Sequence, residues 1–136
     1  MRDINKIIIH CSATREGQAF SVDTIKQWHL ARGWSDVGYH YVVHLDGSIS
    51  YGRDINKRGA HTKGHNTGSI GICYIGGVES DGKTPKDTRT PEQKESLLEL
   101  INVLKKLNSS AVVYGHCDFA AKACPSFDAT TEYKYI

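Results

Sequence analysis

The stretch Lys6-Ile7-Ile8-Ile9-His10-Cys11 (KIIIHC, residues 6–11) decides the centre of the fold. It is a short β-branched run without alternation of polar and apolar residues, which is typical of a strand covered on both faces. His10 stands at the end of this strand. Because ligands of open α/β sheets bind beyond the carboxyl ends of the strands, His10 is a candidate for chemistry.

Five more segments carry helix or strand signals, and they alternate along the chain. Ser21 and Thr90 are placed as helix caps, and Ile25 and Trp28 fall on one face of the first helix, which we expect to be buried. In order, the segments are a helix over about Val22 to Arg32 that Gly33 stops, a β-hairpin from Tyr39 to Tyr51, a buried strand from Ser69 to Ile75, a helix from Pro91 to about Leu107, and a strand from Ala111 to Tyr114. We therefore expect one α/β domain over residues 1–136, with a central mixed β-sheet flanked by helices.

The hairpin signal lies in the sequence Asp46-Gly47 between two β-rich runs. This dipeptide accommodates the positive φ angles of a tight two-residue turn, so we expect strands over Tyr39–Leu45 and Ser48–Tyr51. Residues 52–68 follow without clear periodicity. A loop of this length in a small domain is often functional, and we expect it to lie over a surface cleft.

Length and composition exclude several classes of protein. A chain of 136 residues can bury a core without disulfides, and 17 basic against 15 acidic residues give a formal charge of +2. That charge is too small to indicate binding to nucleic acid or to an anionic membrane surface. No apolar run reaches the roughly 20 residues of a membrane span, and the N-terminus lacks the apolar core of a secretory signal. We expect a soluble monomer made in the cytoplasm.

Seven histidines and four cysteines raise the question of a metal, because imidazole and thiolate together suit zinc. A catalytic zinc site takes three protein ligands and leaves a fourth position for water. His10, His116 and Cys124 could supply the three, and Lys122 could lie over the same site. From spacing alone a second interpretation stays open: the histidines cap backbone groups, the cysteine is a small core residue, and the lysine is a solvated charge.

Five strings in the sequence occur together, and in the same order, in one known family. They are HCSAT (His10–Thr14), GWSDVGYHYVV (Gly33–Val43), DGSISYGR (Asp46–Arg53), GAHTKGHNTGSIGICYIGG (Gly59–Gly77) and KACPSFD (Lys122–Asp128). The chain resembles the zinc-dependent N-acetylmuramoyl-L-alanine amidases of type 2, a family that includes the peptidoglycan-recognition proteins. It is especially similar to the short lysozyme-named endolysins of T-odd phages. The resemblance covers about Lys6 to Asp128, nearly the whole chain.

The resemblance implies hydrolysis of the amide bond between N-acetylmuramic acid and L-alanine in bacterial peptidoglycan. It implies one zinc ion held by His10, His116 and Cys124, with Tyr39 and Lys122 near the attacking water and the scissile carbonyl. Family members that only recognise peptidoglycan commonly lack the cysteine ligand. Cys124 therefore favours hydrolysis over binding alone.

Three residues fall in the loop that resembles the substrate groove of the family: Arg53, His61 and Asn66. There they would meet the carboxylates of the stem peptide and the muramyl group, with Arg53 able to pair with a carboxylate through two hydrogen bonds. The alternative is a solvated loop in which the asparagine forms a turn.

Other functions remain as alternatives. One is a non-catalytic peptidoglycan-binding module, and another is a regulator that binds host RNA polymerase through an N-terminal extension, as some phage amidases do. The nine residues before His10 disfavour polymerase binding. A cysteine hydrolase that uses His10 and Cys11 is disfavoured as well, because adjacent strand residues point to opposite faces. The resemblance to endolysins implies action on the cell wall, with release by a holin where the source is a phage.

Overall fold

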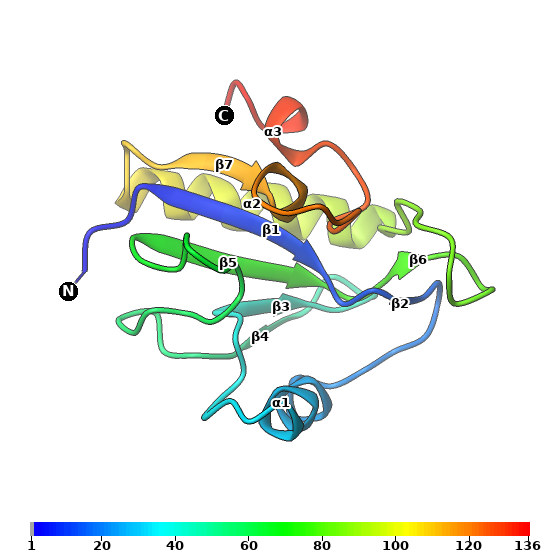
Figure 1. Cartoon of the computed structure of the whole chain (residues 1–136). Coiled ribbons are helices and arrows are strands. Elements are labelled where there is room, and N and C mark those ends of the chain that lie inside the picture. Colours follow the sequence, from blue (N-terminus) through cyan, green and yellow to red (C-terminus); the bar gives the residue numbers. More distant parts are fainter. Residues whose placement is uncertain (1) are drawn as a thin grey trace.

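The structure is a computed structural model that describes residues 2–136. Its centre is a five-stranded mixed sheet with the strand order β4-β3-β5-β1-β7 (Figure 1). The strands are β1 (Lys6–Cys11), β3 (Tyr41–Val43), β4 (Ile49–Tyr51), β5 (Ser69–Tyr74) and β7 (Val112–Gly115). β1 pairs in parallel with β5 and β7, β3 pairs in parallel with β5, and β4 alone runs antiparallel to its neighbour β3.

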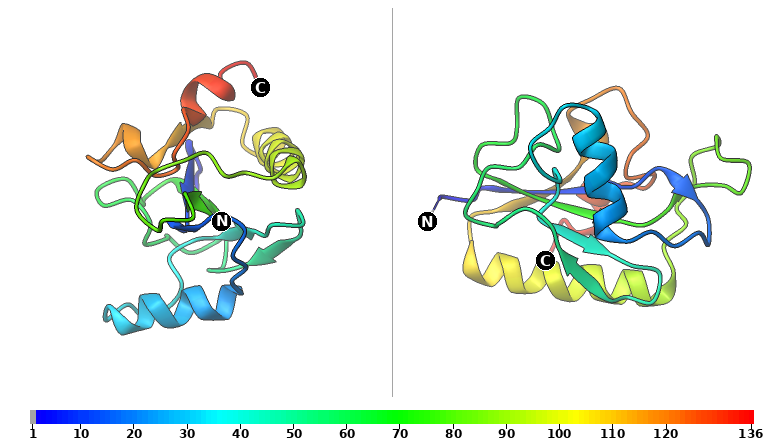
Figure 2. Two further views of the ribbon diagram at one scale, coloured as in Figure 1. Left: turned by 90° about the vertical axis from the view of Figure 1, so that its right-hand side faces the viewer. Right: turned by 90° about the horizontal axis from the view of Figure 1, so that it is seen from below.

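Two helices lie on opposite faces of this sheet (Figure 2). α2 (Pro91–Leu107) packs Leu97, Ile101 and Leu104 into the larger apolar core, and α1 (Val22–Ala31) contributes Ile25 to a smaller one on the other face. The predicted α/β fold, with a central mixed sheet flanked by helices, is confirmed. Among the described residues, we find no helix with the length and apolar character that crossing a membrane requires.

The alternation of side chains along β1 sets up the site. Ile7, Ile9 and Cys11 belong to the core on the α2 side, whereas His10 contacts aromatic rings on the other side of the sheet. All three isoleucines of the strand are fully buried, as the unbroken apolar run predicted. The sheet therefore carries one buried imidazole at the carboxyl end of a strand, facing away from α2.

Both predicted helix caps are present. The Ser21 hydroxyl accepts a hydrogen bond from the Thr24 amide, and Thr90 forms the capping box with Gln93. The predicted burial of Trp28 is wrong: its side chain is 38% exposed and packs edge-on against Phe20. Only two residues of α1 are buried, Ile25 and His29.

The hairpin exists, but the predicted two-residue turn is wrong. The His44 amide donates to the Ser48 carbonyl at 2.8 Å, and the Gly47 amide donates to the His44 carbonyl at 2.9 Å. The turn therefore spans three residues, 45–47, and Gly47 alone in it has a positive φ, of 87°. This is a type I turn followed by a bulge, which needs one left-handed residue where the two-residue turn needs two.

Four short elements complete the chain and shape one end of the sheet. They are the paired strands β2 (Thr14–Arg15) and β6 (Gly77–Val78), the 3-10 helix η1 (His116–Asp118), and α3 (Ala129–Glu132). The segment after β1 thus contains the two-residue strand β2. The segment after η1 folds back over the carboxyl end of β1 (Figure 1).

Candidate metal centre and active site

Three potential metal ligands converge at the carboxyl end of β1. His10 is the penultimate residue of that strand, His116 opens η1 directly after β7, and Cys124 lies in the segment between η1 and α3. Their ligand atoms all lie within 4.8 Å of one another. The Nδ1 atom of His10 is 3.9 Å from the Cys124 sulfur, and the ring centroids of His10 and His116 are 4.6 Å apart. His10 lies more than a hundred positions before His116 in the sequence, and the parallel pairing of β1 with β7 brings the two together.

Backbone groups fix the position of Cys124. The Cys11 amide donates to its sulfur at 3.2 Å, and its carbonyl accepts from the Cys117 amide at 2.8 Å. The next carbonyl, of Pro125, accepts from the buried Tyr74 hydroxyl at 2.6 Å. The cysteine is thereby tied to the end of β1, to η1 and to β5, so a single ligand position is held by three elements.

The electrostatics of the three groups suit a cation. Burial lowers the pKa of His10 well below its usual value, and burial together with the charge of Lys122 lowers the pKa of His116. Both imidazoles are therefore neutral near pH 7 and keep a free lone pair. The hydrogen bond with Cys11 and burial raise the pKa of the Cys124 thiol, so a nearby cation is needed to hold it as a thiolate. Two neutral imidazoles and one such thiol are a ligand set that zinc accepts.

Tyr39 and Lys122 line the same cleft as His116 and Cys124. The ring centroid of Tyr39 lies 5.1 Å from that of His10. Burial raises the pKa of the Tyr39 phenol well above its usual value, so the hydroxyl stays protonated and remains a hydrogen-bond donor. The site thus places one neutral donor and one ammonium beside the ligand group.

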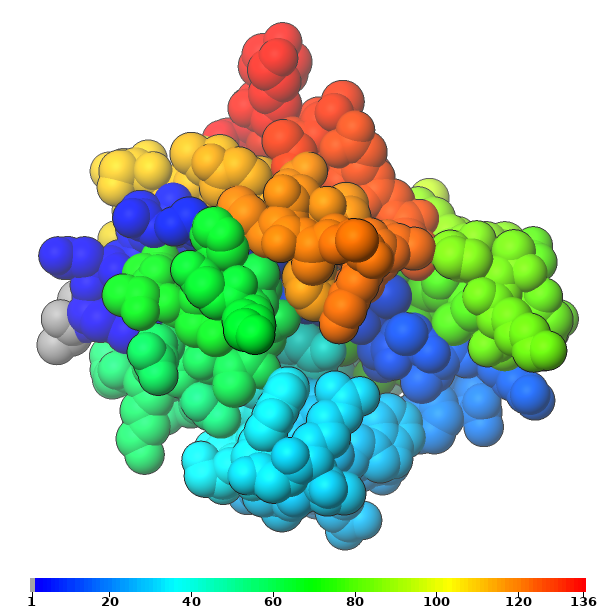
Figure 3. All heavy atoms as spheres, in the orientation of Figure 1, coloured from blue at the N-terminus to red at the C-terminus, as the bar shows by residue number. Residues whose placement is uncertain are grey.

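The cleft has a volume of about 760 Å³. Its walls come from four parts of the chain: residues 11–13, residues 29–39, residues 60–66 and residues 116–124. The cyan, green and orange segments that surround it approach one another in Figure 3. His65 stacks on Phe119 with a centroid distance of 4.1 Å, which ties the long loop to the segment after η1. The expected cleft beside the loop of residues 52–68 is therefore present.

His61 is one of the residues that line the cleft, and its ring also contacts His10. Its side chain is buried behind His10, with its Nδ1 atom 2.9 Å from the Nε2 atom of His10. Burial lowers the pKa of His61 to about 3, which keeps the ring neutral. A ring engaged in this way supports the ligand group, and the expected contact of His61 with substrate stays a prediction.

The other two residues expected in the substrate groove also bond within the protein. The described residues that line the cleft do not include Arg53, whose guanidinium donates to the carbonyls of Val37 and Arg58, each at 2.9 Å. These donors hold the loop, and the pairing of Arg53 with a substrate carboxylate stays a prediction. Asn66 does line the cleft, and its Oδ1 atom accepts from the amides of His61 and Thr62.

His29 is a cleft residue that the sequence did not indicate. Its Nδ1 atom accepts from the Gly38 amide at 2.8 Å, and its ring packs between Trp34 and Tyr39. Burial lowers its pKa to about 4. A histidine in a helix gives no signal of such a contact, since the partners come from the segment after the helix.

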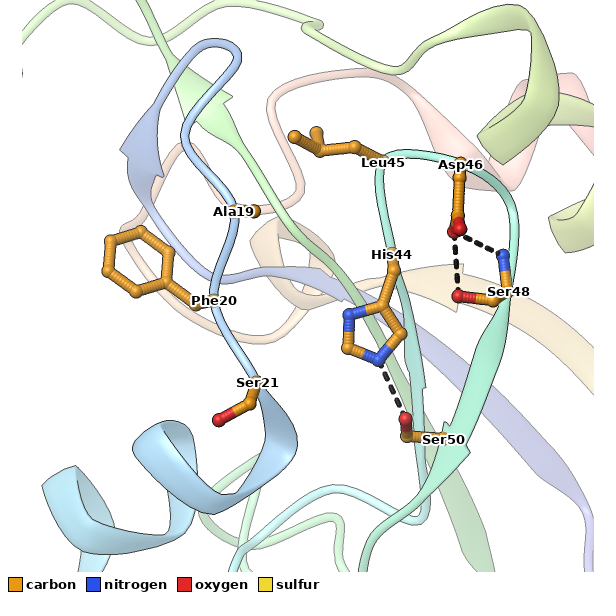
Figure 4. Close-up of a pocket in the computed structure, with 8 residues that line it drawn as sticks. All are labelled: Ala19, Phe20, Ser21, His44, Leu45, Asp46, Ser48 and Ser50. Atoms are coloured by element: carbon orange, nitrogen blue, oxygen red, sulfur yellow. Dashed lines mark hydrogen bonds between the residues drawn. The ribbon is translucent and has the colours of Figure 1, made fainter.

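A second hollow lies between the segment before α1 and the β3–β4 hairpin (Figure 4). It has a volume of about 570 Å³, and its polar groups bond to one another: His44 to Ser50 at 2.7 Å and Ser48 to the Asp46 carboxylate at 2.6 Å. None of the predicted site residues lines it. The candidate site is therefore the cleft lined by His116 and Cys124.

A His, His, Cys group at the strand ends of an α/β sheet, beside a cleft with a phenol and an ammonium, could hold a metal ion of the kind that metal-dependent hydrolases use. The family of N-acetylmuramoyl-L-alanine amidases matches residues 1–127, and the chain belongs to this family. It is an amidase that cleaves the bond between N-acetylmuramic acid and L-alanine of peptidoglycan. The family and the activity implied by the sequence motifs are thereby confirmed.

Individual relatives agree with this assignment. The chain is 42% identical over 127 residues to the endolysin of Klebsiella phage KP32, which covers 93% of this chain and 83% of that endolysin. It is 45% identical over 122 residues to the endolysin of Escherichia phage T7, with coverage of 90% and 80%. The solved structure of the N-acetylmuramoyl-L-alanine amidase LysC from Clostridium intestinale URNW superposes with a TM-score of 0.82, at 28% identity, over 96% of this chain and 82% of that one.

Proposed function

We propose that this amidase is a zinc enzyme of the endolysin type, with zinc bound by His10, His116 and Cys124. The observation that carries the proposal is the convergence of these three ligand atoms within 4.8 Å of one another, beside a cleft large enough for part of a muropeptide. When bound, zinc supplies Lewis acidity, which activates water and polarises an amide carbonyl. The other requirements of the reaction fall to residues of the cleft.

Tyr39 and Lys122 are proposed to act on the reacting amide. The protonated Tyr39 hydroxyl can donate a hydrogen bond to the carbonyl oxygen as negative charge develops there, and the Lys122 ammonium can stabilise the same charge. Both residues line the cleft with His116 and Cys124, and burial of the phenol strengthens its bond to a developing oxyanion. Asn66 shapes the wall of the cleft through its two backbone hydrogen bonds.

The proposed biological role is degradation of the bacterial cell wall by a monomer that is made in the cytoplasm and is released to its substrate by a holin. The endolysin relatives support this role. The alternative within the same fold is a module that binds peptidoglycan without cutting it. Cys124 favours hydrolysis, because a third zinc ligand is of no use to a binding module.

The substitution Cys124→Ser tests the ligand assignment. Purified sacculi are incubated with the wild type, with Cys124→Ser and with a matched control, Cys117→Ser, which alters an exposed thiol in the neighbouring segment. We expect new amino-terminal alanine from the wild type and the control, and a loss of most activity together with zinc in Cys124→Ser. Full activity in Cys124→Ser would overturn the assignment, and sacculus binding without release by the wild type would favour the recognition module.

A further inference from the structure

His61 stands in the middle of a buried chain of hydrogen bonds that ends at His10. The Ser69 hydroxyl lies 3.0 Å from the Asn66 carbonyl and 3.2 Å from the His61 Nε2 atom. On its other side, the His61 ring places Nδ1 at 2.9 Å from the His10 Nε2 atom. Side chains of Ser69, His61 and His10 are all buried, so each bond forms away from water.

The donor and acceptor of each hydrogen bond in this series follow from the Asn66 carbonyl, which stands at the end away from His10. A carbonyl can only accept, so the Ser69 hydroxyl donates its single proton to the Asn66 carbonyl. The Ser69 oxygen must then accept a hydrogen bond from His61 Nε2. A neutral imidazole carries one N–H, which in His61 is at Nε2. His61 Nδ1 is therefore unprotonated and accepts a hydrogen bond from His10 Nε2. His10 Nδ1 is therefore unprotonated as well, and it is the nitrogen that lies 3.9 Å from the Cys124 sulfur.

The hydrogen bonds of the Thr62 hydroxyl are compatible with the same assignment of donors and acceptors. Its hydroxyl lies 3.0 Å from His61 Nδ1 and 3.2 Å from His10 Nε2, so it can donate to the first and accept from the second. No bond in this arrangement requires a second proton on either imidazole.

Two glycines hold the His61 ring in place. A Cβ atom at Gly71 would lie 2.6 Å from the ring, and one at Gly59 would lie 2.5 Å from its Cδ2 atom. The backbone on either side of the ring is therefore as close as it can be, and the amide of His61 is held by Asn66. The slot accepts an imidazole in one position, which points Nδ1 at His10.

We propose that His61 is a positioning residue that holds His10 in the tautomer whose Nδ1 atom is free to bind the metal. The proposal deepens the zinc function proposed above and rests on it, since it assigns His10 as a ligand. Hydrogen-bond partners behind a ligating histidine fix its tautomer and its ring orientation, and their loss typically weakens metal binding by about 10–100-fold. His61 thus acts on the metal through His10, whose Nε2 atom it contacts.

Two measurements test the proposal. The first is the tautomer of His10 in metal-free protein, read from 15N chemical shifts of labelled histidine. The second is zinc affinity, measured by competition with a chelator of known affinity. The variants are His61→Phe, which removes the acceptor, and His61→Gln, whose amide oxygen can still accept from His10. The matched control is His44→Phe, which breaks a histidine–hydroxyl pair in the second hollow (Figure 4).

We expect the wild type to show His10 protonated at Nε2, and His61→Phe to show mixed tautomers with zinc affinity lower by about 10–100-fold. His61→Gln should recover part of that loss, and His44→Phe should bind zinc as the wild type does. Should His61→Phe fail to fold, Ser69→Ala takes its place, because it removes the acceptor that fixes the His61 proton. We then expect the same change in tautomer with a smaller loss of affinity.

Unchanged zinc affinity in a folded His61→Phe or Ser69→Ala protein overturns the proposal. So does lower affinity with an unchanged His10 tautomer, because that result indicates a general packing effect. A wild type that binds no zinc but has His10 protonated at Nε2 contradicts the zinc function alone. The tautomer measurement therefore separates failure of the positioning role from failure of the metal site.

Discussion

The substitution Arg89→Met is expected to lower the free energy of unfolding by about 2–3 kcal/mol. Arg89 is buried, and its guanidinium donates two hydrogen bonds to Asp87 and two to Glu132, all between 2.7 and 2.9 Å. It also lies 3.4 Å from the ring centroid of Phe127. These contacts join the segment before α2 to α3, and so they hold the part of the chain that follows Cys124.

The magnitude follows from what the substitution leaves behind. Hydrogen bonds to charged groups contribute about 1.5–3 kcal/mol, and breaking a fully buried ion pair costs about 3–5 kcal/mol. Asp87 and Glu132 are 32% and 44% exposed, so water can replace part of what they lose. Methionine also keeps apolar contact with Phe127. A loss of about 2–3 kcal/mol corresponds to a melting temperature lower by roughly 6–12 °C.

The effect should depend on pH. The hydrogen bond from Arg89 lowers the pKa of Glu132, and the Arg89 contacts outweigh burial to lower the pKa of Asp87. In the unfolded chain both carboxyls titrate near about 4. The stabilisation is therefore complete above that pH and is lost as the pH falls through the lower values of the folded protein. The difference between wild type and Arg89→Met should shrink in acid.

Urea unfolding followed by circular dichroism at pH 7 and at pH 3 measures both effects. We expect a lower midpoint at pH 7 with an unchanged slope, and a smaller difference at pH 3. The control is Arg58→Met, at an exposed arginine, which should change stability by less than about 0.5 kcal/mol. Equal stability of wild type and Arg89→Met at pH 7, or a difference that stays the same at pH 3, would refute this reasoning.

Three further substitutions separate the roles of the cleft residues. Tyr39→Phe should retain zinc and lower kcat by about 10²–10³-fold in a sacculus assay, because it removes one donor to the oxyanion; zinc loss in this variant would contradict that role. Lys122→Met should likewise retain zinc and lose turnover by a similar factor, and normal turnover would remove the lysine from the reaction. Asn66→Ala should destabilise the protein by about 1–3 kcal/mol in urea, since it leaves the His61 and Thr62 amides without their acceptor; an unchanged midpoint would show that water replaces it.

Local signals predicted most of the secondary structure. The run of residues 6–11 is a strand with those same ends, and the capping box at Thr90 begins α2 where expected. These features depend on neighbours in sequence: β-branched residues favour a strand, and a hydroxyl followed three residues later by an amide side chain satisfies the first amides of a helix. The prediction of a two-residue turn at Asp46-Gly47 was wrong because the same dipeptide also fits a three-residue turn.

The parts of the site that the sequence could not predict depend on contacts between distant segments. His61 and Arg53 were expected to face substrate, since both are polar residues in a long loop. Their hydrogen-bond partners are a strand residue 51 positions away in one case and loop carbonyls in the other. Likewise, no local pattern indicates that Arg89 meets Glu132, 43 positions away. Residue type suggested the chemistry, and only the fold shows which partner each group has.

The most direct test of the zinc amidase is metal content measured together with the release of amino-terminal alanine from purified sacculi, before and after removal of metal by a chelator. The account predicts one zinc per chain, alanine release that stops when the metal is removed, and recovery when zinc is returned. Alanine release that persists in fully metal-free protein would contradict the central claim.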